Sequence, residues 1–129
     1  MGEGITVECT SCDYTETFWL GIGFMYSSLE NVIFLVSKSR QDDVLNILQN
    51  ENVYDVTYEH KLFICPKCHH LASRFDYAIL YNDNKVYQPY FRCSECRTKL
   101  VPVEEPVENI PCPICSRKSL TQFASIMWD

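Results

Sequence analysis

Four C-x-x-C pairs constrain this chain of 129 residues more than any other feature. They account for all eight cysteines: Cys9, Cys12, Cys65, Cys68, Cys93, Cys96, Cys112 and Cys115. A disulfide framework rarely spaces cysteines so regularly, and none is left over here. Eight thiolates in pairs are enough for two tetrahedral sites of four sulfurs each. The spacing therefore predicts that the chain folds around two metal ions, with all eight cysteines as ligands.

The rest of the composition excludes two other classes of protein. A hydrophobic fraction of 47% is ordinary for a globular chain and excludes a disordered one. The longest apolar run, at residues 18–26, is too short for a membrane helix of about 20 residues. The N-terminus has neither a basic region nor an apolar core, so we expect no secretory signal. These features predict a cytoplasmic protein, in a compartment that keeps thiols reduced.

Hydrophobic periodicity between the cysteine pairs predicts mostly strands. Alternating β-branched and aromatic residues predict strands at 5–8, 13–20, 53–64 and 119–128. A capping box predicts a short helix over residues 27–36, and an amphipathic stripe predicts a second helix over 40–49. Residues 75–91 read as a β-hairpin around a turn at 82–84, and a shorter hairpin is expected at 97–110.

The cysteine pairs can share the metals in three ways, of which the crossed one requires threading of the chain and is discounted. In the sequential arrangement, the first two pairs form one site and the last two pairs form the other. In the nested arrangement, the second and third pairs share one site, and the first and fourth pairs share the other. We favour the sequential arrangement, because in each site a strand leaves one pair and a strand returns to the next. Either way the two sites should be neighbours, since the 75–91 hairpin returns the chain to Cys93 beside Cys68.

Three of the pairs resemble the knuckles of the zinc-ribbon family: Cys65-Pro-Lys-Cys68, Cys93-Ser-Glu-Cys96 and Cys112-Pro-Ile-Cys115. The resemblance implies Zn²⁺ ions with a structural role, β-hairpins on each side of each metal, and usually no catalysis. It covers the knuckles and their flanking strands, but not the helical segment at 27–50. Family knuckles often carry glycine after the second cysteine, where this chain has Asp13, His69, Arg97 and Ser116.

The expected fold is a β-rich α+β protein in which a β-hairpin joins two four-cysteine zinc ribbons, each holding one Zn²⁺. Residues 1–68 would form the first ribbon, with the helical insertion at 27–50. Residues 69–92 would form the connecting hairpin, and residues 93–129 the second ribbon.

Charge restricts where the chain could contact nucleic acid. The net charge of −6 gives no general attraction to phosphate backbones, but residues 65–100 carry 6 basic and 3 acidic residues. Basic and aromatic residues alternate there, a composition that can hold single-stranded nucleic acid. The candidate contacts are Lys67, Arg74, Arg92, Arg97 and Lys99. We favour a simpler interpretation, in which the aromatic residues shield the metal sites from water and the basic residues offset their negative charge.

The sequence offers metal ligands but no catalytic group. A site with four cysteine ligands leaves no open position for a reactive water. We therefore expect a non-catalytic zinc-binding module, with neither membrane nor small-molecule substrate, that docks on a protein or nucleoprotein machine as an adaptor, regulator or inhibitor. Two alternatives stay open: a transcription- or RNA-related regulator that binds nucleic acid through residues 67–99, and a rubredoxin-like electron carrier with iron in the same sites.

Overall fold

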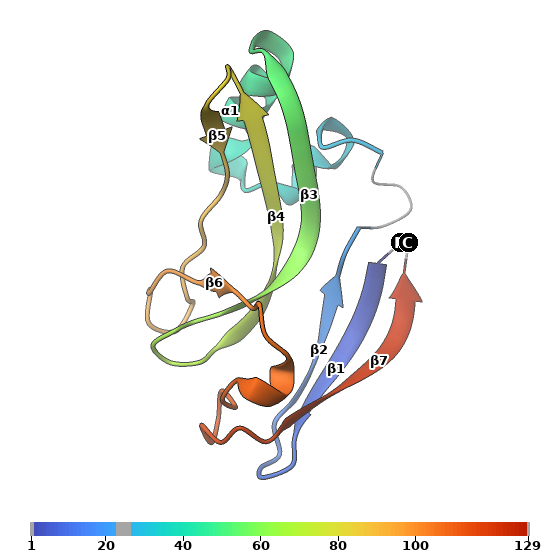
Figure 1. The fold of residues 1–129 in the computed structure, drawn as a ribbon, viewed down its shortest axis with the longest axis vertical. Coiled ribbons are helices and arrows are strands. Elements are labelled where there is room, and N and C mark those ends of the chain that lie inside the picture. Colours follow the sequence, from blue (N-terminus) through green and yellow to red (C-terminus); the bar gives the residue numbers. More distant parts are fainter. Residues whose placement is uncertain (1, 23–26, 129) are drawn as a thin grey trace.

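The structure is a computed structural model in which residues 2–22 and 27–128 are described, the part from residue 124 onward by its backbone alone. The described part is rich in strands, with one α-helix and two short 3-10 helices, so the predicted β-rich α+β class is confirmed. The strands form two antiparallel sheets (Figure 1). None of the helices described is long and apolar enough to cross a membrane.

The smaller sheet is built from the two ends of the chain. Strands β1 (Gly2–Cys9), β2 (Thr15–Leu20) and β7 (Leu120–Trp128) lie in the order β2-β1-β7. Strand β1 pairs with β7 over eight positions, from Gly2 opposite Trp128 to Cys9 opposite Leu120. Figure 1 shows the start of β1 next to the end of β7 at one end of this sheet.

The larger sheet contains the middle of the chain. Strands β3 (Val53–Ile64), β4 (Leu71–Tyr81), β5 (Lys85–Tyr87) and β6 (Val101–Pro102) lie in the order β5-β4-β3-β6. Strands β3 and β4 form a long hairpin with eleven registered pairs. The predicted hairpin around residues 82–84 is present, with Ile79 opposite Tyr87. Its returning strand ends two residues before Pro89, which cannot donate a hydrogen bond to the sheet.

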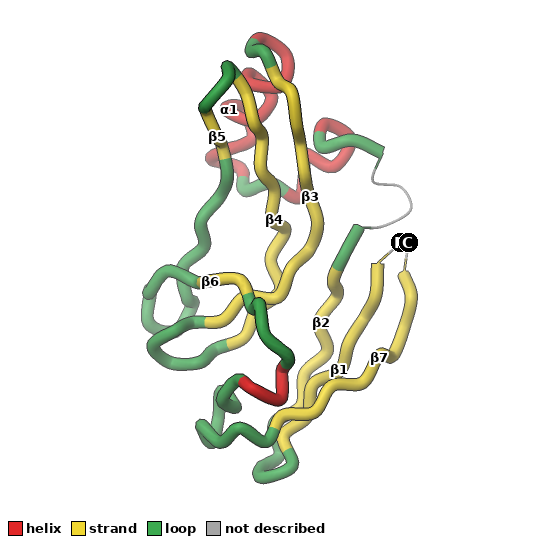
Figure 2. Tube along the Cα trace, viewed as in Figure 1, coloured by secondary structure: helices red, strands yellow, loops and turns green. Residues whose placement is uncertain are grey.

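Both predicted helices are present and cover one face of the larger sheet. The 3-10 helix η1 (Glu30–Leu35) precedes helix α1 (Lys38–Asn50). Ser28, within the predicted capping box, accepts a hydrogen bond from the backbone N–H of Asn31 at 3.2 Å. Figure 2 shows these helical segments beside β3, β4 and β5. The short 3-10 helix η2 (Val107–Asn109) lies elsewhere, near the smaller sheet. Their apolar residues pack against β4 in a core of eight buried side chains: Leu29, Val32, Val36, Val44, Ile47, Phe75, Tyr77 and Ile79.

The hairpin expected at residues 97–110 was wrong. Strand β6 pairs with the edge of β3 instead, with Val101 opposite Ile64, and the backbone N–H of Val103 donates to Leu62. The following residues turn into η2, and Val107 within it and Ile110 directly after it are buried in the core under the smaller sheet. Burial of these two side chains therefore replaces the returning strand of the expected hairpin.

Cysteines belong to two of the three cores. Cys9 and Cys112 are buried among the side chains under the smaller sheet, and Cys65 and Cys93 are buried in a small core of five residues at the base of the larger one. The core between the helices and β4 contains no cysteine among its buried residues. The packing of two of these three cores therefore depends on how the cysteine side chains are arranged.

Candidate metal centres

The structure gathers the eight cysteines into two groups of four, and it does so in the nested arrangement. The terminal cluster contains Cys9, Cys12, Cys112 and Cys115. The hairpin cluster contains Cys65, Cys68, Cys93 and Cys96. Within each cluster all four sulfur atoms lie within 4.8 Å of one another. The sequential arrangement that we favoured was therefore wrong.

Strand pairing explains the nested arrangement. The hairpin of β3 and β4 turns through residues 65–70, so the second cysteine pair sits at the end of that hairpin. Strand β6 and the bridge between Arg92 and Lys99 bring the third pair to the same place. At the other end, pairing of β1 with β7 brings residues 112–115 to the turn between β1 and β2. Both pairings join segments far apart in the chain, so local periodicity does not predict them.

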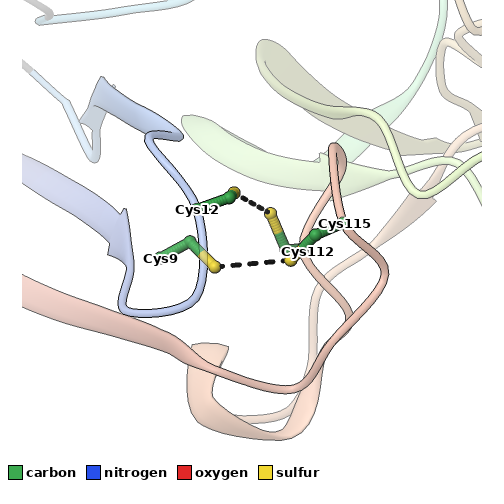
Figure 3. Close-up of side chains that lie close together, drawn as sticks. All are labelled: Cys9, Cys12, Cys112 and Cys115. Atoms are coloured by element: carbon green, nitrogen blue, oxygen red, sulfur yellow. Dashed lines mark hydrogen bonds between the residues drawn. The ribbon is translucent and has the colours of Figure 1, made fainter.

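The terminal cluster has the spacing of a four-sulfur metal site. The Sγ atoms of Cys9 and Cys115 are 3.6 Å apart, and those of Cys12 and Cys112 are also 3.6 Å apart (Figure 3). In Figure 3, the two cysteines of one knuckle point toward the two of the other across a shared space. A tetrahedron with metal–sulfur distances of about 2.3 Å has sulfur–sulfur edges of about 3.8 Å. The donor set therefore fits one tetrahedral ion.

The hairpin cluster repeats this spacing. Sulfur–sulfur distances are 3.4 Å for Cys65 and Cys96 and 3.4 Å for Cys68 and Cys93, while Cys68 and Cys96 are 3.8 Å apart. All eight thiols are free, and these separations far exceed the disulfide bond length of about 2.05 Å. In both clusters the first cysteine of each pair is buried and the second is half-buried. Each cluster could hold one metal ion.

The backbone of each knuckle directs N–H groups at the buried sulfur. The Sγ of Cys9 accepts from the N–H of Ser11 at 3.3 Å, and that of Cys112 accepts from Ile114 at 3.4 Å. The two knuckles of the hairpin cluster do the same. The N–H of Cys68 donates to the Sγ of Cys65, and the N–H of Glu95 donates to the Sγ of Cys93, both at 3.4 Å. Such bonds stabilise a thiolate, which is the form that binds a metal.

Three knuckles require a left-handed backbone immediately after the second cysteine. The φ angles are 67° at His69, 67° at Arg97 and 64° at Ser116, and each of these residues donates its N–H to the carbonyl of the first cysteine. Zinc-ribbon knuckles often place glycine at this position, which avoids the steric cost. The geometry is therefore kept here without glycine. Asp13, at the same position of the first knuckle, does not have a positive φ.

Two hydroxyl groups beside the sulfurs were missed from the sequence. Ser119 Oγ lies 3.2 Å from Cys9 Sγ, and Thr98 Oγ1 lies 3.2 Å from Cys96 Sγ. The Ser119 contact is the main cause that lowers the pKa of Cys9 to about 6. The Thr98 contact does the same for the pKa of Cys96, also to about 6. A hydroxyl residue two positions after Cys96 or four positions after Cys115 was the only available signal.

Cys12 and Cys68, one half-buried thiol in each cluster, have the opposite tendency. A backbone hydrogen bond from Tyr14 lowers the pKa of Cys12, but burial and the neighbouring thiols outweigh it and raise that pKa to about 12. The His70 backbone lowers the pKa of Cys68, and the thiol of Cys93 with burial raises it to about 12. One thiol therefore loses its proton readily while its neighbour retains it. Four thiolates can coexist at these distances only with a cation between them.

The two clusters are neighbours, as the sequence predicts. A cavity of about 490 Å³ is lined by Cys68 and Glu95 from the hairpin cluster and by Pro113 and Ile114 from a knuckle of the terminal cluster. The side chain of Ile114 is 70% exposed.

The candidate basic residues divide into two sets. Arg92 and Lys99 lie on either side of the third knuckle, and the Arg92 guanidinium donates to the backbone carbonyl of Arg97. Lys67 is exposed on the second knuckle, and the Arg74 guanidinium donates to the carbonyl of its neighbour Ser73. The structure therefore brings together the three residues of segment 92–99.

One basic residue was missed from the sequence. Arg40, in the first turn of α1, lies over the rings of Tyr87 and Tyr90, at 6.0 and 5.8 Å from the ring centroids. It joins Arg92 and Lys99, which lie 5.3 and 5.8 Å from the Tyr90 centroid. No local sequence signal links residues 40 and 90, because the contact depends on how the helix packs on the sheet.

No protein-family model, curated protein or solved structure matches this chain. The functional argument therefore rests on its own residues. Two four-cysteine groups make it a candidate metal-binding module, compatible with a zinc-ribbon-like arrangement.

Proposed function

We propose that this chain is a non-catalytic module whose fold is held together by two structural Zn²⁺ ions and which docks on a protein or nucleoprotein machine. The observation that carries the proposal is the convergence of four sulfurs within 4.8 Å, twice, from segments far apart in the chain. In each centre two knuckles at the ends of β-hairpins would clamp one ion. The structural unit would then be a pair of zinc ribbons, nested rather than consecutive.

The chemistry of the donor set favours a structural ion over a catalytic one. Four cysteine ligands complete a tetrahedral shell, whereas catalytic zinc sites keep one position for water or substrate. The N–H groups directed at sulfur further neutralise the ligand charge. The ions would thus do here what a larger apolar core does in other proteins.

Both zinc and iron accept four cysteine ligands, so the donor set does not distinguish them. Zinc is preferred because the knuckles resemble those of zinc ribbons. Elemental analysis of protein purified under reducing conditions tests the choice. We expect two zinc ions per chain and a colourless sample. A visible thiolate-to-iron absorption band with one or two iron ions per chain would favour the electron-carrier alternative.

The docking part of the proposal is supported by exposed apolar side chains. Ile114, at the tip of the last knuckle, and Phe34, in η1, are 70% and 71% exposed. Anchors of this kind often occupy a pocket on a partner protein. Quantitative pull-down with Ile114→Ser, compared with the surface variant Lys118→Gln, tests it. Loss of the same partners with Ile114→Ser alone is expected, and equal recovery by both variants would contradict it.

A second candidate function is contact with nucleic acid through the basic segment. The observation that favours it is the gathering of Arg40, Arg92 and Lys99 around the ring of Tyr90. Cations beside an exposed aromatic ring suit single-stranded nucleic acid, because the cations can contact its phosphates and the ring can stack on its bases. An electrophoretic mobility shift with a single-stranded oligonucleotide, weakened by salt and by Arg92→Ala, is the test.

A further inference from the structure

A pocket of about 300 Å³ lies between the start of α1, strand β4 and the loop that follows β5. Three arginines line it, Arg40, Arg92 and Arg97, and none of the acidic residues in the described part of the chain does. Its apolar wall includes Phe75 and Pro89. A concave site with several cations and no carboxylate favours an anionic ligand.

The positive charge of this pocket is not compensated by ion pairs. Across residues 2–22 and 27–128, the salt bridges found all involve Lys61, so none of the three arginines pairs with a carboxylate. The Arg92 guanidinium donates to the carbonyl of Arg97 and to the hydroxyl of Tyr90, and Arg40 is 3.5 Å from the hydroxyl of Tyr87. Neutral partners orient the guanidinium groups but leave their charge available.

The N-terminus of α1 adds to this field. Ser37 lines the pocket and is the residue before the helix, yet its side chain makes no capping hydrogen bond. The first turn contains no acidic residue. The amide groups that begin a helix carry partial positive charge and bind anions readily. By itself this would not define a site, but it faces the same space as the arginines.

A buried hydroxyl gives independent evidence for a ligand. Tyr77 lines the pocket and is only 3% exposed, and its hydroxyl has no hydrogen-bond partner within the described part of the chain. Buried polar groups are nearly always paired, so an unpaired one calls for an explanation. Burial, with a smaller effect of Tyr87, raises the pKa of Tyr77 to about 12, while the charge of Arg40 opposes the rise. The hydroxyl is therefore protonated at neutral pH and can donate.

An aromatic side chain at the edge of the pocket indicates what carries the anion. Tyr90 is 48% exposed and lies within 6 Å of the charged groups of Arg40, Arg92 and Lys99. The Arg92 hydrogen bond and the charges of Arg92, Arg40 and Lys99 lower the pKa of Tyr90. A planar, partly exposed ring beside an anion site suits a nucleotide, which offers a base for stacking and a phosphate for the cations.

We propose that this pocket binds the phosphate group of a nucleotide, with Arg40, Arg92 and Arg97 contacting the phosphate oxygens. Tyr77 donates its hydroxyl to the same group, and Tyr90 is placed to contact the sugar or base. The choice of a nucleotide rests on the second proposed function, nucleic-acid contact, and the pocket deepens it by naming the site. The phosphate can come from a single-stranded nucleic acid or from a free mononucleotide, and the experiment separates these sources.

The test uses the full chain with its metal bound. Fluorescence anisotropy measures binding of a labelled oligothymidylate of about ten nucleotides, and calorimetry measures thymidine monophosphate and inorganic phosphate. If three cations contact phosphate, the logarithm of affinity should fall with the logarithm of salt concentration with a slope of about −2. Arg40→Gln and Arg97→Gln should each weaken binding about tenfold or more. Lys118→Gln removes one charge outside the pocket and should leave affinity unchanged.

Tyr77→Phe gives a readout that a general loss of charge cannot mimic. It removes only the unpaired hydroxyl, so the ligand-free protein should melt at a higher temperature than the wild type. The same variant should bind the phosphate probes about three- to tenfold more weakly. A more stable protein that binds less well identifies the hydroxyl as a ligand contact.

The outcomes separate the pocket from the wider function. If the oligonucleotide fails to bind but the mononucleotide binds and is weakened by the same substitutions, the pocket stands and the nucleic-acid function falls. If the oligonucleotide binds the wild type and all pocket variants equally, the pocket assignment is overturned and the nucleic-acid function survives. Absence of binding to all three phosphate probes, or binding of a phosphoserine peptide without any nucleotide, overturns the assignment to a nucleotide.

Discussion

Removing the metal ions should abolish cooperative folding of the chain. The terminal cluster joins cysteines 100 positions apart, and the hairpin cluster joins cysteines 25 positions apart. If each ion acts as a cross-link, the loops that it closes correspond to about 4.7 and 3.5 kcal/mol of chain entropy, about 8 kcal/mol together. The whole stability of a natural domain is only about 5–15 kcal/mol. Loss of both ions therefore removes most of what holds the fold.

The assay is a thermal melt followed by circular dichroism, before and after chelation under reducing conditions, with metal content measured on the same samples. We expect a cooperative transition for the metal-bound protein and none for the metal-free chain. Adding zinc back should restore the transition, which controls for irreversible damage. A metal-free sample that keeps both its spectrum and its melting temperature would refute the reasoning, because the remaining cores would then be sufficient on their own.

Three further predictions address single groups. Ser116→Gly should stabilise the protein by about 0.5–1 kcal/mol, or about 2–4 °C in Tm, since it relieves a φ of 64°, whereas Asp13→Gly, where φ is not positive, should not stabilise it. Ser119→Ala and Thr98→Val should each weaken zinc affinity about tenfold in a competition titration with a coloured chelator, because each removes a hydroxyl 3.2 Å from a ligand sulfur; unchanged affinity would make these contacts incidental. Burial lowers the pKa of His60 below its ordinary value of 6.5, so the folded state resists protonation and the free energy of unfolding falls as pH drops below that value. His60→Gln should reduce this loss of stability in urea melts between about pH 7 and 5.5. Parallel curves for the variant and the wild type would show that His60 does not cause the pH dependence.

Local features of the fold were readable from the sequence because they depend on neighbouring residues. The alternation from Val53 to Ile64 gave strand β3, and the stripe of Val44 and Ile47 gave the buried face of α1. The turn at 82–84 gave the hairpin of β4 and β5. Each of these signals lies within one segment of about a dozen residues, where periodicity and turn chemistry act directly.

Apart from the hydroxyl of Thr98, which lies two residues from Cys96, the features that the sequence did not show depend on contacts between distant segments. Val107 and Ile110 were expected in a returning strand, but they are three residues apart, and the 3-10 turn that contains Val107 lets both be buried under the smaller sheet. Arg40 reaches Tyr90 only because α1 packs on β4. The ligand residues themselves were identifiable because C-x-x-C spacing is local, but their partners across each cluster were not.

Chain entropy shows why the nested arrangement needs the sheets. Sequential pairing would have closed loops of 53 and 16 residues, against 100 and 25 in the structure. The difference in loop closure favours the sequential arrangement by about 1 kcal/mol. Eight registered pairs between β1 and β7 hold the first and fourth cysteine pairs together, pairing of β6 with β3 brings the third pair to the second, and these contacts outweigh that small cost. The 25-residue loop of the hairpin cluster should therefore close first. Its closure shortens the effective length of the 100-residue loop, which makes the terminal cluster easier to form.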